Sequence, residues 1–136
     1  MKKIFRTHPT SDRISLILLL IRLVAGGAMM QHGWGKIQAP FAWMGPDATV
    51  PAFLQALAAV SEFGGGVAWI LGALTPLASF GLACTMAFAT YFHGVVKGDP
   101  WVGQSSFELA LLYFVIALSF IIAGPGKYSV DKKLFG

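Results

Sequence analysis

The stretch ISLILLLIRLVAGGAMMQHGWGKI, residues 14–37, decides the fold class. Its first half is apolar or glycine except for Ser15 and Arg22. The stretch is long enough to cross the hydrocarbon core of a bilayer as a helix, which takes about 20 residues. It ends on His32 and Lys36, two polar side chains that are costly inside a membrane. We interpret residues 14–37 as a first membrane span that carries a functional or structural polar group.

The composition of the whole chain is typical of a membrane protein. Of its 136 residues, 56% are hydrophobic and only 12% are charged, whereas a soluble domain carries about 25% charged residues. Residues 63–96 contain no Asp, Glu, Lys or Arg, which is long enough for most of two further spans. A water-soluble fold is excluded because the polar residues could not cover its surface. The net charge of +4 comes mostly from the two ends, so membrane topology explains it and no nucleic-acid partner is needed.

Proline and glycine clusters divide the chain into four apolar segments. We expect membrane spans at residues 14–37, 51–73, 76–96 and 105–123. Their short connections favour antiparallel neighbours. The prediction is therefore an all-α fold, a four-transmembrane-helix antiparallel bundle that forms a single membrane domain over residues 1–136.

The distribution of lysine and arginine predicts the orientation of this bundle. Basic residues precede the first span and follow the fourth, whereas the loop at 38–50 has none and the loop at 97–104 has only Lys97. The positive-inside rule then places both termini in the cytoplasm and these two loops outside. The outer loops and span ends also carry an interfacial aromatic belt of Trp34, Trp43 and Trp101.

Small residues and one cysteine allow more limited predictions. Gly64, Ala68 and Gly72 recur at every fourth position, a spacing that lets helices approach closely in lipid. They either pack within the bundle or form a homo-oligomer, and both alternatives stay open. The lone Cys84 excludes an intrachain disulfide and a C-x-x-C pair, and we expect it to be buried and inert.

Ionisable residues inside or at the rim of the spans are the strongest functional signal. A charge in the hydrocarbon core costs roughly 2.5–3.5 kcal/mol on insertion scales, so such groups tend to face the bundle interior and to find partners. In the predicted topology all but one lie between the outer rim and the midplane, with Glu62 the deepest; the exception, Arg22, lies nearer the inner side. The set comprises Arg22, His32, Lys36, Glu62, His93 and Glu108.

Helical spacing places several of these groups on common faces. One stripe contains Arg22, Gly26, Met29, Gly33 and Lys36, and a second contains Glu62, Gly65, Gly66 and Trp69.

We expect a polar cluster in the outer half of the bundle, with Glu62, His93 and Glu108 as candidate catalytic residues and His32, Lys36 and Trp69 as candidate cofactor-binding residues. No metal site is predicted. The alternative is that the acidic and basic groups only form structural ion pairs that fix the helix register.

A series of short motifs resembles the DoxX family of small bacterial integral membrane proteins. The motifs are HGWGK at 32–36, EFGGG at 62–66, A-x-x-x-H at 89–93, ELALLY at 108–113 and GPGKYSVD at 124–131. The resemblance implies a four-helix protein of the bacterial cytoplasmic (inner) membrane. Relatives are associated with membrane oxidoreductase systems, among them a thiosulfate:quinone oxidoreductase subunit and an assembly with superoxide dismutase and a sulfurtransferase. The motif positions include His32, Lys36, Glu62, His93 and Glu108.

Two classes of function follow. In the first, the chain is a subunit of a membrane oxidoreductase system that contacts a quinone, with a histidine donating to a carbonyl, Lys36 stabilising negative charge, and Glu62 or Glu108 relaying protons. Such a chain needs another redox protein as a partner because it shows no cofactor motif of its own. A haem between His32 and His93 is a further hypothesis, and the only support for it is the presence of these two histidines at similar depth.

In the second class the chain is not an enzyme. It binds a small ligand or lipid, or acts as an assembly partner for another membrane protein. A transporter is a third class, although four spans are few for alternating access and no internal repeat supports one.

Overall fold

The computed structural model describes residues 10–136, and all regular elements in that range are helical. They are α2 (Asp12–Gln38), α3 (Ala52–Leu71), α4 (Thr75–Tyr91), the π-helix η1 (Phe92–Val96), α5 (Glu108–Ala123) and the short α6 (Val130–Phe135). Three stretches are long and apolar enough to cross a membrane: α2, α3, and α4 together with η1. Helix α5 is equally apolar but has only 16 residues. The structure therefore has the helical membrane architecture that the sequence predicts.

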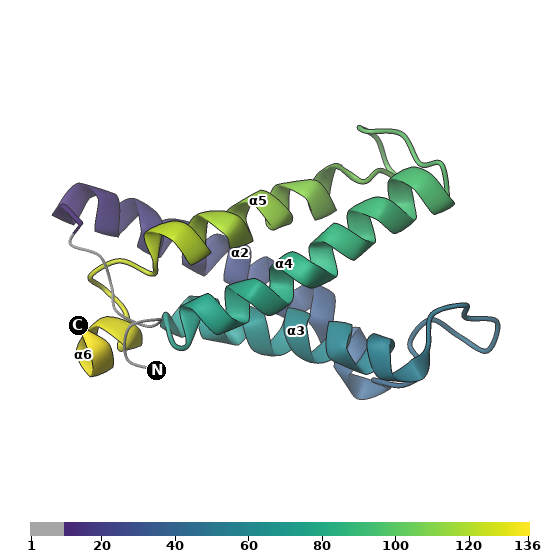
Figure 1. Cartoon of the computed structure of the whole chain (residues 1–136), viewed down its shortest axis with the longest axis horizontal. Coiled ribbons are helices and arrows are strands. Elements are labelled where there is room, and N and C mark those ends of the chain that lie inside the picture. The colour runs from purple at the N-terminus through teal and green to yellow at the C-terminus, as the bar shows by residue number, and fades with distance from the viewer. Residues whose placement is uncertain (1–9) are drawn as a thin grey trace.

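The helices form two hairpins, as Figure 1 shows. Helix α2 packs most extensively on α3, and α4 packs most extensively on α5. A tight turn joins α3 to α4, with Gly72 in the left-handed conformation at φ +64° and Pro76 in the first turn of α4, where proline is well tolerated. Beyond this turn, α3 and α4 separate toward the opposite end of the molecule.

Glycines allow α2 and α3 to approach each other backbone to backbone. A Cβ atom at Gly33 would lie 2.3 Å from the backbone nitrogen of Phe63, and one at Gly66 would lie 2.5 Å from the backbone nitrogen of Met30. Gly26 is packed against the carbonyl oxygen of Gly66 in the same way. Packing within the bundle thus accounts for these glycines. Dimerisation through the Gly64 face stays a prediction.

The buried faces of α2 and α3 are those that the helical stripes predict. Arg22, Gly26, Met29 and Gly33 are buried on α2, and Glu62, Gly65, Gly66 and Trp69 are buried on α3. The core lies where these faces meet α4 and α5. Its buried apolar side chains are Leu18, Ala25, Met29, Trp69, Leu82, Ala83, Met86, Ala117 and Phe120.

The C-terminal segment closes one end of the bundle, which we call the terminal end. The guanidinium of Arg22, fully buried on α2, donates a hydrogen bond to the carbonyl oxygen of Tyr128. The carboxylate of Asp131 accepts from the backbone N–H groups of Leu74 and Thr75 at 2.7 and 2.8 Å. Arg22 therefore has a partner far from the predicted polar cluster.

Both ends of the described chain meet at this terminal end. Asp12 and Lys127 form an exposed ion pair of 2.7 Å, and α6 lies beside the α3–α4 turn (Figure 1). We call the opposite end, which carries the loops at 39–51 and 97–107, the loop end. The assignment of the terminal end to the cytoplasm stays a prediction from the positive-inside rule.

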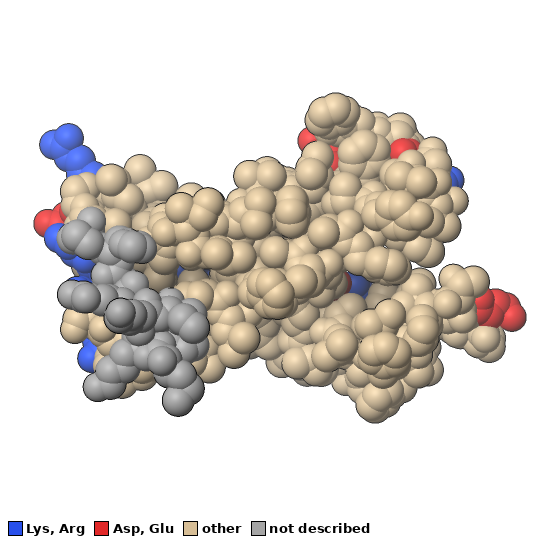
Figure 2. Space-filling view, viewed as in Figure 1, with Lys and Arg blue, Asp and Glu red and all other residues tan. Residues whose placement is uncertain are grey.

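The outer surface of the helices suits a lipid environment. Figure 2 shows that charged side chains gather toward the two ends and that the middle of the visible face carries almost none. Large apolar side chains on α2, α3, α4 and α5 are exposed, for example Val24, Phe53, Leu77 and Ile122. Apolar side chains in contact with acyl chains need no further burial.

Candidate functional site

A pocket of about 390 Å³ lies between α3 and α4 toward the loop end. This volume falls in the range of small-molecule sites, about 300–1,000 Å³. Figure 2 shows a notch in the visible face toward the loop end, with a basic side chain visible inside it. The lining is mostly apolar and aromatic, with a few polar groups. It consists of Lys36, Trp43, Met44, Val50, Leu54, Gln55, Leu57, Ala58, Glu62, Cys84, Thr85, Phe88, Ala89, Phe92, His93 and Lys97.

The central polar feature of this pocket is an ion pair between Lys36 and Glu62. The Nζ atom of Lys36 lies 2.6 Å from Oε1 of Glu62. Glu62 is only 2% exposed, whereas the side chain of Lys36 is 26% exposed. Because an unpaired charge at this depth is very costly, each group needs the other.

The sequence places the two residues of this pair opposite each other. Lys36 is in the last turn of α2, where the helix dipole favours a cation. Glu62 is in the middle of α3, on its buried face. The absence of a side chain at Gly33 lets the backbones of α2 and α3 meet beside Glu62 and Phe63. This close approach brings the lysine within hydrogen-bonding distance of the carboxylate.

The pair leaves hydrogen-bonding capacity unused. Oε2 of Glu62 is buried and has no hydrogen-bond partner among the described residues. The ammonium of Lys36 has three N–H donors; one is directed at Glu62, and the group also lies 4.4 Å from the centre of the Trp43 ring. A buried polar atom without a partner is uncommon in native proteins and requires an explanation.

The loop between α2 and α3 is held over the pocket by Gln55, which is 3% exposed. The side chain of Gln55 accepts from the N–H of Met44 at 3.1 Å and donates to the carbonyl of Val50 at 2.9 Å. The indole N–H of Trp43 donates to the backbone carbonyl of Gln55 at 2.9 Å. Sequence reasoning missed Gln55. The available signal was its position seven residues before Glu62, on the same face of α3.

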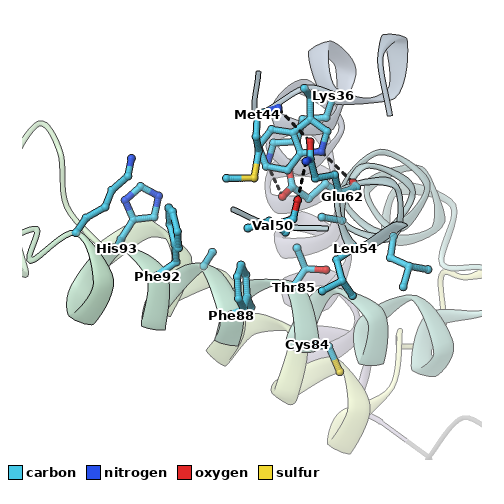
Figure 3. A pocket seen from close by; sticks show the side chains of 16 residues that line it. Lys36, Met44, Val50, Leu54, Glu62, Cys84, Thr85, Phe88, Phe92 and His93 are labelled. Carbon is cyan, nitrogen blue, oxygen red and sulfur yellow. Dashed lines mark hydrogen bonds and ion pairs between the residues drawn. The ribbon is translucent and has the colours of Figure 1, made fainter. Parts of the chain in front are cut away.

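The opposite wall of the pocket contains a π-helical turn, η1, that follows α4 directly. The backbone N–H of Lys97 donates to the carbonyl of Phe92, five residues earlier, at 2.9 Å. Such turns are rare and often occur at functional sites. Nδ1 of His93 lies 2.7 Å from Oδ2 of Asp99, a carboxylate that sequence reasoning also missed. Figure 3 shows Phe88, Phe92 and His93 on the α4 side, across from Lys36, Met44 and Glu62.

The structure brings some predicted site residues together and separates others. Lys36, Glu62 and His93 line the same pocket, and no other predicted site residue belongs to its described lining. The ring of His32 packs edge-on against Tyr113 of α5, with centroids 6.2 Å apart.

Glu108 and Trp69 also lie elsewhere. Glu108 is exposed in the first turn of α5, where a helix N-terminus favours a carboxylate. Trp69 is fully buried in the core, where its indole N–H donates to Ser79 at 2.9 Å and its ring meets Phe120. Trp69 therefore has a structural role in this arrangement.

Two expectations on cysteine and metals can also be compared with the structure. The prediction that Cys84 is buried is wrong, because it is exposed and belongs to the lining of the pocket. The described residues contain no group of three or more His, Cys, Asp or Glu side chains that could hold a metal ion.

Comparisons with known proteins identify relatives of this chain. The model of the DoxX family matches residues 17–94. The chain is 33% identical over 121 residues to an uncharacterized protein of Haemophilus influenzae, covering 87% of this chain and 90% of the relative. It is 34% identical over 124 residues to "Inner membrane protein YqjF" of Escherichia coli, covering 86% of this chain and 91% of the relative. No solved structure matches the chain significantly.

Proposed function

Since the chain belongs to the DoxX family and is a multi-pass protein of the cytoplasmic membrane, we propose that it binds a quinone-type molecule in the pocket between α3 and α4. It does so as a subunit of a membrane oxidoreductase system. The observation that carries this proposal is the Lys36–Glu62 ion pair in the wall of a mostly apolar pocket. In the proposed orientation, with both termini in the cytoplasm, the pocket lies in the outer half of the bilayer.

The pocket has the features that a lipophilic ring with polar oxygens requires. Phe88 and Phe92 offer aromatic faces, and Lys36 offers N–H donors to a carbonyl oxygen. The Nδ1–H of the His93 ring donates to the carboxylate of Asp99, which fixes the orientation of the ring and leaves Nε2 of the neutral imidazole as a hydrogen-bond acceptor. A quinone supplies two-electron redox chemistry when bound, while the chain contributes orientation, an apolar slot and groups that exchange protons.

The proposal assigns each pocket residue a limited role. Lys36 holds an oxygen of the ring and stabilises negative charge that develops on it. Glu62 orients the ammonium of Lys36, and it is the carboxylate placed to exchange a proton with the ring oxygen. His32, Trp69 and Glu108 lie outside the lining, so the proposal gives them no contact with the ligand. His32 does not belong to the lining of the pocket that contains His93 and packs instead against Tyr113, so no haem is proposed.

The electron donor or acceptor lies on another protein. The chain contributes no cofactor motif that would carry electrons by itself, so the proposed system includes a partner subunit. The apolar faces of α2 and α5 around Val24 and Ile122 are exposed in the single chain, and lipid or a partner helix can cover them equally well.

A second candidate function is non-enzymatic binding of a lipid or assembly with another membrane protein. The observation that favours this second function is the direct contact between the two charged groups of the ion pair. At 2.6 Å, Lys36 and Glu62 neutralise each other, which is enough to fix α2 against α3 without any ligand. Under this alternative the pocket takes an acyl chain and shows no preference for a ring with oxygens.

Titration of a short-chain ubiquinone into the protein in lipid nanodiscs tests the proposal. Quenching of tryptophan fluorescence reports binding, because Trp43 lines the pocket, and a Trp43→Phe variant identifies its share of the signal. We expect saturable binding that weakens about tenfold or more in Lys36→Met, because a charge-assisted hydrogen bond is lost.

The matched control is Lys127→Met, which removes a lysine from an ion pair of 2.7 Å at the terminal end. It should bind ubiquinone like the unmodified chain. Equal binding by all variants, or quenching that never saturates, would show that the pocket is not the site.

A further inference from the structure

The proposed site leaves one acceptor and several donors unused in the same wall of the pocket. Oε2 of Glu62 has no hydrogen-bond partner in the part of the chain that the structure describes. The ammonium of Lys36 directs one N–H at Oε1 and is still 26% exposed. A ligand that fits this wall must accept a hydrogen bond from Lys36 and donate one to Glu62.

We propose that the pocket selects a hydroxyl-bearing aromatic amphiphile, a phenol or hydroquinone, over an oxidised quinone or an aromatic ether. This inference rests on the proposed function and specifies the ligand class of the same pocket. A hydroxyl oxygen accepts from Lys36 while its O–H donates to Glu62. A quinone carbonyl and an ether oxygen only accept, so they leave Oε2 without a partner. Hydrogen bonds to an ionised carboxylate are about twice as strong as neutral ones.

The apolar part of the lining determines which ring and tail the ligand carries. The ring of Trp43, in the loop at 39–51, lies 4.4 Å from Nζ of Lys36. Phe88 and Phe92 line the pocket from α4 and η1, on the side across from Lys36 (Figure 3). Aromatic side chains on both sides favour a planar ring between them. Leu57 and Phe88 are exposed at 61% and 47% and line the pocket, so an alkyl tail on the ring can extend toward the acyl chains of the bilayer.

The position of Oε2 is compatible with such a contact. Glu62 lines the pocket, although its Oε2 atom is covered by neighbouring atoms. The terminal torsion of a glutamate is broad and roughly two-fold, so a modest rotation of the carboxylate presents Oε2 to the cavity at little cost. Lys36 can follow this rotation because its stem is flexible and partly exposed.

The test uses two probes that differ in one substituent, because the hydroxyl hydrogen of the first is replaced by a methyl group in the second. 4-Octylphenol and its methyl ether, 4-octylanisole, share the ring and the tail, and neither is a quinone. Each is titrated into the full chain in nanodiscs with Trp43 fluorescence as the readout. We expect the phenol to bind about tenfold or more tightly than the ether after correction for partition into the lipid, because only the phenol satisfies Glu62.

Variants assign the preference to the ion pair. The double variant Lys36→Met/Glu62→Met replaces the pair by apolar side chains, a change that buried ion pairs often tolerate without loss of stability. It should bind both probes with equal affinity. The control Asp12→Met/Lys127→Met removes the ion pair of 2.7 Å at the terminal end and should keep the full preference for the phenol.

The outcomes separate this inference from the proposed function. If ether and phenol bind the unmodified chain equally, or if the preference survives in the pocket double variant, Glu62 does not select a hydroxyl, while the pocket remains a ligand site. If no probe and no quinone binds saturably, the proposed function itself fails and this inference fails with it.

Discussion

Replacing Gly33 by alanine tests the geometry on which the site depends. A Cβ atom at this position would lie 2.3 Å from the nitrogen and 2.7 Å from the Cα atom of Phe63. Both are backbone atoms, so no side chain can rotate away. Ordinary contact then requires α2 to move from α3 by about 1 Å, and overpacking of this kind costs about 1–3 kcal/mol. The better helix propensity of alanine returns up to about 1 kcal/mol.

We therefore expect Gly33→Ala to lower the free energy of unfolding by about 1–2 kcal/mol net, which corresponds to a fall in Tm of roughly 3–8 °C. The assay is thermal unfolding in nanodiscs, followed by circular dichroism. Lys36 lies one turn beyond Gly33, so the same displacement should lengthen its contact with Glu62 and weaken ligand binding. The matched control is Gly35→Ala on the same helix, where a Cβ atom meets nothing within 4 Å. If Gly33→Ala and Gly35→Ala have the same Tm, the close approach of α2 and α3 is not as described.

Three further substitutions test the roles of individual side chains in the structure. Asp131→Ala should lower the free energy of unfolding by about 2–4 kcal/mol, measured by thermal unfolding, because it removes a carboxylate that caps α4 through two backbone N–H groups; unchanged stability would contradict this role. Gln55→Leu should release the loop over the pocket, seen as faster proteolysis and a red-shifted emission of Trp43, since both side-chain hydrogen bonds of Gln55 to the loop are lost; an unchanged cleavage rate would argue against it. Asp12→Ala should change the free energy of unfolding by less than about 1 kcal/mol, because its ion pair with Lys127 is exposed, and a large fall in Tm would contradict that estimate.

Sequence periodicity was sufficient to predict which faces of α2 and α3 are buried, although His32 and Glu108, which were also expected in the polar cluster, are exposed. The stripe through Arg22 and Gly33 and the stripe through Glu62 and Trp69 both face the interior. A membrane helix must hide its polar and small residues from lipid, so the pattern within one helix identifies its inner face. The high hydrophobic content and the low content of charged residues were sufficient to predict the membrane architecture from composition.

The partners of those residues could not be predicted in the same way. A stripe gives the direction of a side chain but not the neighbour that it meets, which depends on how two helices cross. Arg22 meets the C-terminal segment at Tyr128, and Trp69 meets Ser79 and Phe120. Both were therefore correctly expected to face inward, while only the structure identifies the partner of Arg22 and shows that Trp69 lies away from the pocket.

Depth along the membrane was also an incomplete guide to the site. Glu108 and His93 both come near the loop end, yet only His93 lines the pocket. The difference arises because α4 continues into a π-helical turn and because α3 and α4 diverge while α4 and α5 stay together. A π turn depends on the register of backbone hydrogen bonds, which hydropathy does not encode.

The central claim is that a lipophilic ring binds between α3 and α4 beside Lys36 and Glu62. Photolabelling with an azidoquinone in nanodiscs, followed by peptide mass spectrometry, tests it most directly. We predict labelling confined to the segments at 36–62 and 84–97, which contain the residues that line the pocket, and its suppression by excess short-chain ubiquinone. Labelling spread over the lipid-facing residues of α2 and α5, with no competition by ubiquinone, would contradict the claim.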